Sequence, residues 1–209
     1  MLKRLFGRSS QPAKKAVSII VVSGLPRSGT SMMMKMLEAT GLEPVIDEIR
    51  IADDDNPKGY YEFERVKQLD KGDYGWLDEA DGKVVKVISA LLEHLPAEYE
   101  NSEYSYKVLF MRREMSEILA SQKKMLVNRE EATDKVKDAE LTALFEKHLS
   151  KVKGWLSAQP NVDVLYVDYN QLLSDPNAQI PTINRFLGGT LDQNEMAGVV
   201  DPSLYRNRT

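Results

Sequence analysis

Short apolar runs alternate along this chain with longer segments in which apolar residues recur at helical spacing. The runs predict strands at about residues 18–23, 83–88, 106–111 and 162–167, with a shorter strand at 43–46. The segments between them predict helices at about 28–39, 63–70, 114–128, 132–158 and 178–187. Because nearly continuous apolar strands alternate with helices, we expect an α/β fold of three layers, with a central, mostly parallel sheet flanked by helices.

The first predicted strand ends in a glycine-containing turn, Gly24-Leu25-Pro26-Arg27-Ser28-Gly29-Thr30-Ser31, which leads into the first helix. Such a turn directs backbone N–H groups and the positive end of a helix at one point, which favours a phosphate or sulfate group. The spacing matches the phosphate loop G-x-x-x-x-G-K-[ST], except that Thr30 replaces the Lys and the cation is Arg27. The turn therefore predicts a fold of the P-loop type, but not an ordinary ATPase or GTPase, which needs that Lys.

Composition narrows the range of functions. The 209 residues suit one domain, and a net charge of −4 argues against general nucleic-acid binding. The absence of cysteine excludes disulfides and thiolate sites, and two histidines far apart in sequence do not suggest a metal centre. No apolar run has the length of a membrane span. Residues 1–16 are basic and lack acidic residues, so we expect a flexible tail before a single domain at 17–209, in a cytoplasmic protein.

The loop resembles the 5′-phosphosulfate loop of sulfotransferases, which use 3′-phosphoadenosine 5′-phosphosulfate (PAPS) and carry Lys or Arg before Ser-Gly-Thr. Tyrosyl-protein sulfotransferases have the same Pro-Arg-Ser-Gly-Thr sequence, and the chain is also similar to bacterial sulfotransferase-like proteins. The resemblance implies that PAPS is the co-substrate and that no metal is required. It also implies the residues that hold the 5′-phosphosulfate, which are Pro26, Arg27, Ser28, Gly29, Thr30 and Ser31.

A second cation cluster, Arg112-Arg113, follows the predicted strand at 106–111, where ligands of open α/β sheets bind. Arginine suits bidentate recognition of phosphate. Ser121 lies eight residues beyond Arg113, and this arrangement is similar to the 3′-phosphate site of sulfotransferases, with Glu117 at the usual acidic position. The resemblance thus implies that Arg113 and Ser121 hold the 3′-phosphate, with Arg112 as the alternative ligand.

The chemistry requires cations near the transferred group and a base for the acceptor. Lys86 lies in an otherwise apolar strand and matches the Lys of the Lys-Thr-His sequence of cytosolic sulfotransferases, but Ile88 replaces the His. Glu48 matches the spacing of the catalytic Glu of tyrosyl-protein sulfotransferases, and Asp47 is the alternative base. The resemblance therefore implies Arg27, Lys86 and Glu48 as the catalytic residues.

Two other functions remain open at this stage. The apolar run 162–167 ends at Asp168, as a magnesium-binding strand of a kinase or NTPase would, although Asp168 could equally cap the turn that follows. The loss of the His at Ile88 is compatible with a relative that binds a nucleotide without turnover. Of these three functions, we favour a sulfotransferase that acts on a hydroxyl or amine of a small molecule or peptide.

Overall fold

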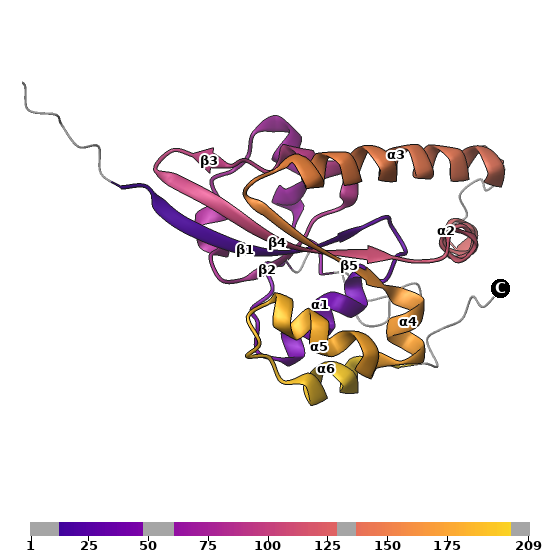
Figure 1. Cartoon of the computed structure of the whole chain (residues 1–209). Coiled ribbons are helices and arrows are strands. Elements are labelled where there is room, and N and C mark those ends of the chain that lie inside the picture. The colour runs from indigo at the N-terminus through magenta and orange to yellow at the C-terminus, as the bar shows by residue number, and fades with distance from the viewer. Residues whose placement is uncertain (1–12, 48–60, 129–136, 202–209) are drawn as a thin grey trace, which may run out of the picture.

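The computed structural model describes residues 13–47, 61–128 and 137–201. Its strands are β1 (Lys15–Gly24), β2 (Val84–Lys86), β3 (Glu98–Tyr99), β4 (Ser102–Arg112) and β5 (Val162–Asp168). Its α-helices are α1 (Thr30–Ala39), α2 (Met115–Asn128), α3 (Asp138–Ala158), α4 (Tyr169–Ser174), α5 (Pro176–Phe186) and α6 (Gln193–Val199). Three 3-10 helices complete the described part: η1 (Glu64–Lys71), η2 (Leu77–Ala80) and η3 (Ser89–His94). Figure 1 shows α1, α4, α5 and α6 on one face of the sheet and α3 on the other, as an α/β fold requires.

The strands are ordered β2–β1–β4–β3, and β5 also pairs with β4. All pairings are parallel except that of β3 with β4. Val22 of β1 lies opposite Lys86 of β2, and Gly24 lies opposite Met111 of β4. The ends of β1, β2, β4 and β5 therefore meet at one edge, called the carboxyl edge below. This edge is where ligands of such sheets bind.

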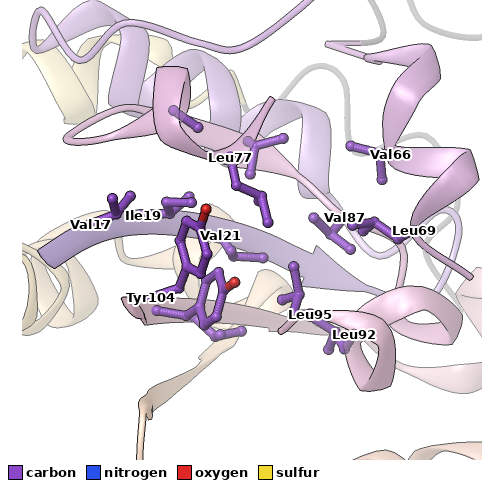
Figure 2. Packing of buried hydrophobic residues seen from close by; sticks show 14 of the residues in the cluster. Val17, Ile19, Val21, Val66, Leu69, Leu77, Val87, Leu92, Leu95 and Tyr104 are labelled. Atoms are coloured by element: carbon purple, nitrogen blue, oxygen red, sulfur yellow. The ribbon is translucent and has the colours of Figure 1, made fainter. Parts of the chain in front are cut away.

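Two apolar clusters, one on each face, hold the layers together. The first packs β1 and β4 against α3 and the 3-10 helices, and Figure 2 shows Val17, Ile19 and Val21 of β1 within it. The second packs the sheet against α1, α4, α5 and α6, with Met33, Met34 and Met36 of α1 fully buried. Because side chains alternate between the two faces, β1 contributes to both clusters. This packing fixes the position of the β1–α1 turn.

Several helices and strands differ in the structure from the bounds predicted from the sequence. The strand predicted at 43–46 is only an isolated bridge between Pro44 and Val84, in which the Val84 N–H donates to the Glu43 carbonyl oxygen and the Val45 N–H donates to that of Val84. The helix predicted at 63–70 is the 3-10 helix η1, and β4 begins at Ser102 rather than 106. The helix predicted at 132–158 is described from Asp138 onward. Within the described ranges, no helix combines the length and apolar character that crossing a membrane requires.

Candidate active site

The turn between β1 and α1 presents the start of a helix to the carboxyl edge. α1 begins at Thr30 after Gly29, and within the described structure no side chain caps this end and no acidic residue occupies its first turn. The first N–H groups of a helix have no acceptor inside the helix, and its positive end attracts anions. The hydroxyl of Ser28 is buried beside Gly24 and has no hydrogen-bond partner among the described residues. The turn thus has the donors that a phosphosulfate group requires.

Two glycines allow this turn to pack closely. A Cβ on Gly24 would lie 2.4 Å from Ser28 Oγ and 2.7 Å from the carbonyl oxygen of Met111. Gly29 has φ +96°, and a Cβ there would lie 2.2 Å from the Tyr169 ring. Arg27 adopts φ 70°, which is costly for a residue with a side chain and is found most often at functional sites. The surrounding packing therefore holds the turn in a strained conformation.

Arg27 connects the turn to α2. Its Nε donates a hydrogen bond of 2.9 Å to Ser121 Oγ, and its carbonyl oxygen accepts one of 3.0 Å from Arg113 Nη1. Ser121 is 5% exposed. The residues predicted for the 5′-phosphosulfate and the 3′-phosphate thus form one continuous site between β1 and β4.

A buried ion pair fixes the orientation of Arg113. Its Nε donates to Glu117 Oε2 at 2.9 Å, and the two side chains are only 8% and 2% exposed. Asn170 Nδ2 donates to the other oxygen, Glu117 Oε1, at 2.9 Å, while Asn170 Oδ1 accepts from the Glu114 backbone N–H. The guanidinium carbon of Arg113 lies 4.5 Å from the centre of the Tyr169 ring. Its remaining N–H groups can therefore approach an anion in a fixed direction.

The neighbouring Arg112 points elsewhere. It is exposed, and its guanidinium lies 5.9 Å from the Tyr166 ring centre rather than at the turn. This placement favours Arg113 over Arg112 as the anion ligand. The role of Arg113 at the 3′-phosphate stays a prediction.

Of the predicted catalytic residues, the structure describes Arg27 and Lys86 but not Glu48. Lys86 ends β2 and is half-buried, two positions before Ile88, which is 46% exposed. Asp47 Oδ2 accepts a 2.6 Å hydrogen bond from the Glu64 backbone N–H, so this carboxylate holds the start of η1. Glu48 lies outside the described residues. The structure therefore brings Lys86 to the carboxyl edge beside β1 and leaves the base untested.

Two site residues were not predicted from sequence. Tyr169 contacts both Gly29 and Arg113, and Asn170 anchors Glu117. Both directly follow β5 at the carboxyl edge, and this position after a strand is the signal that could have revealed them. Asp168, considered above as a magnesium ligand, instead caps α4 by accepting from the Gln171 N–H at 2.8 Å. Over the described ranges, no group of three or more His, Cys, Asp or Glu residues could hold a metal.

The comparisons with known proteins agree with the fold described above. The family model described as sulfotransferase domain matches residues 18–207. The sulfotransferase STF1 from Mycobacterium tuberculosis H37Rv has a similar structure, with a TM-score of 0.52, 17% identity, and coverage of 90% of this chain and 71% of that one. The sulfotransferase domain from the curacin biosynthetic pathway gives a TM-score of 0.52 and 17% identity, covering 90% of this chain and 79% of that one. No curated protein sequence matches the chain.

Proposed function

The chain belongs to the sulfotransferase family, whose members use PAPS as co-substrate, and we propose that it transfers the sulfuryl group to a hydroxyl or amine acceptor at the site between β1 and β4. The hydrogen bond between Arg27 and Ser121 carries this proposal, because it joins the turn for the 5′-phosphosulfate to the helix that carries the 3′-phosphate residues. A kinase reaction is not favoured, since the turn lacks the P-loop Lys and Asp168 serves as a helix cap.

Each residue has a role that its position supports. The start of α1, with Pro26 through Ser31, would hold the 5′-phosphosulfate, and Arg113 with Ser121 the 3′-phosphate. In the transfer, the acceptor oxygen or nitrogen bonds to sulfur while the bond from sulfur to the 5′-phosphate oxygen breaks. Arg27 and Lys86 would stabilise the charge that develops on the leaving phosphate.

The proton of the acceptor goes to a base, for which we retain Glu48. Asp47 accepts a hydrogen bond from the backbone N–H of Glu64, which makes it the weaker candidate for the base.

We also propose a cytoplasmic location and an acceptor that is a small molecule or a peptide. We further propose that the chain divides into a basic tail at 1–16 and a domain at 17–209.

The reaction can be tested with sulfur-labelled PAPS in the presence of EDTA, by following the transfer of the label to a mixture of phenols, alcohols and amines. The desulfated product, adenosine 3′,5′-bisphosphate (PAP), is measured in the same reactions. We expect metal-independent turnover that depends on an acceptor. PAP that binds without any turnover, with no change in the Glu48→Gln variant, would instead indicate a non-catalytic relative.

The Lys86→Met variant separates binding from chemistry. Because Lys86 is proposed to act on the leaving group, we expect kcat to fall by about 100-fold or more while the affinity for PAP changes only a few-fold. Lys83→Met is the matched control, because Lys83 lies just before β2 and pairs with Glu43. An unchanged kcat in Lys86→Met, measured at saturating PAPS, would remove Lys86 from the mechanism.

A further inference from the structure

The strand β5 forms an edge of the sheet. Within the described ranges it pairs only with β4, and Figure 1 shows it with α3 above and with α4 and α5 below. Val164, Leu165 and Tyr166 are half-buried, whereas their partners in β4, residues 108–110, are at most 3% exposed. Because helices cover both faces of the sheet, the open side of β5 is its outer edge.

The strand register shows which backbone groups of β5 face outward. The N–H of Tyr106 in β4 donates to the carbonyl oxygen of Asn161, so Asn161 directs its carbonyl group toward β4. Every second residue after Asn161 faces β4 in the same way, because backbone groups alternate in direction along a strand. The residues between them direct their N–H and C=O groups away from the sheet, and these are Val162, Val164, Tyr166 and Asp168.

The chain itself closes both ends of this outer edge. At the first end, the Val162 N–H donates to the carbonyl oxygen of Gln159 at 3.4 Å. At the other end, the side-chain amide of Gln179 on α5 pairs with both backbone groups of Asp168. Gln179 Nε2 donates to the Asp168 carbonyl oxygen at 2.6 Å, and Gln179 Oε1 accepts from the Asp168 N–H at 3.0 Å. A side chain thus takes the place of a neighbouring strand there, which is one way that proteins block an edge.

The middle of the edge is unpaired and is complementary to itself. The N–H groups of Val164 and Tyr166 and the carbonyl groups of Val162, Val164 and Tyr166 have no hydrogen-bond partner among the described residues. An antiparallel copy of the same edge, centred on Val164, matches these groups. The two Val164 residues exchange a pair of hydrogen bonds, and each Tyr166 N–H donates to the Val162 carbonyl oxygen of the other copy.

The side chains match in the same arrangement. Val162, Val164 and Tyr166 lie on the face that α3 covers, where they pack against the first apolar cluster. In the antiparallel pair, Val164 lies opposite Val164 and Val162 lies opposite Tyr166. Such β-branched and aromatic pairs across strands are favourable. On the other face, Asp163 lies opposite Leu165, so no two like charges lie directly opposite each other.

We propose that the outer edge of β5 at residues 162–166 is the contact surface for a second copy of this chain. The two copies pair antiparallel about a two-fold axis at Val164 and join their sheets into one. A two-fold contact requires a surface that is complementary to itself, and the unpaired groups of this edge meet that requirement.

Hydrogen exchange of single amides, followed by NMR at increasing concentrations of the full chain, tests this surface beside sedimentation velocity. We expect a dimer to form as the concentration rises. Exchange at the Val164 and Tyr166 amides should then slow by about tenfold or more. The amides of Asp163 and Leu165 already donate to β4, so their exchange should be protected at every concentration.

Two pairs of variants test the contact at its centre. Val164→Pro removes the central N–H at an edge position, where proline is tolerated, and should weaken the dimer by about tenfold or more. Val164→Ile keeps the N–H and is its control. Since the chain has no cysteine, oxidised Val164→Cys can cross-link only through this position. It should give a covalent dimer, because paired Cα atoms there lie about 5.5 Å apart, while the exposed Glu146→Cys should not.

Three results would overturn the inference. The first is a chain that stays monomeric while exchange at Val164 and Tyr166 does not change with concentration. The second is a dimer in which these two amides exchange as fast as in the monomer and Val164→Cys does not cross-link, since the contact would then lie elsewhere. The third is slow exchange at both amides at every concentration down to that of the monomer, because the chain's own residues would then cover the edge.

Discussion

Replacing Arg113 with Ala should strongly weaken PAP binding and destabilise the fold. The change removes the cation at the 3′-phosphate site and the donor to the Arg27 carbonyl, and it leaves Glu117, which is 2% exposed, without its ionic partner. Breaking a buried ion pair on one side costs about 3–5 kcal/mol. We expect a loss of about that size in the free energy of unfolding, measured by urea denaturation, and a loss of PAP affinity of about 100-fold or more.

Two further variants separate the effect on stability from the effect on binding. Arg112→Ala removes a neighbouring arginine that is exposed and lies over Tyr166, so it should leave both quantities nearly unchanged. The double variant Arg113→Met/Glu117→Leu replaces the buried pair with apolar side chains, which is often nearly neutral for stability. It should recover most of the stability of the wild type but not the affinity for PAP. If the double variant bound PAP normally, Arg113 would be a structural residue only.

Replacing Gly29 with Ala should disrupt the turn itself. The new Cβ would lie 2.2 Å from the Tyr169 ring, which is closer than atoms can approach, so the ring or the turn must move. Tyr169 also lies against Arg113, and both parts of the site are therefore disturbed. We expect the affinity for PAP, measured by calorimetry, to fall by about 100-fold or more, because the N–H groups at the start of α1 lose their alignment.

Gly41→Ala provides the matched control for this prediction. Gly41 has φ +88°, close to that of Gly29, but a Cβ there would have no atom within 4 Å. Both variants share the cost of the left-handed backbone, about 1–2 kcal/mol, and only Gly29→Ala adds the clash. Equal losses of stability and an unchanged PAP affinity in both variants would contradict the role assigned to the contact between Gly29 and Tyr169.

The sequence alone was sufficient for the α/β fold and for the family of the chain. The turn from Gly24 to Ser31 carries its own signal, because the glycines, Arg27 and the apolar run before it are adjacent in the chain. The eight-residue spacing of Arg113 and Ser121 is also local, as they lie at the end of β4 and on α2. Capping of the following turn was one of the two roles that the position of Asp168 left open, and the hydrogen bond to Gln171 confirms it.

Contacts between distant segments could not be predicted in this way. The bond from Arg27 to Ser121 and the packing of Tyr169 on Gly29 depend on β4 lying between β1 and β5, an order that apolar periodicity does not determine. The short helices α4 and α6 were missed because one or two turns are too short to establish a helical period. The same limit applies to Ser89 and His148, which pair across fifty-nine positions of the sequence.

The most direct test of the central claim is calorimetric binding of PAP in EDTA, beside ATP with magnesium, to the wild type and to Arg27→Ala. We predict tight, metal-independent binding of PAP that Arg27→Ala weakens by about 100-fold or more, because Arg27 links the turn to Ser121. Binding of magnesium-ATP without binding of PAP would contradict the account and would assign the site to a kinase or NTPase.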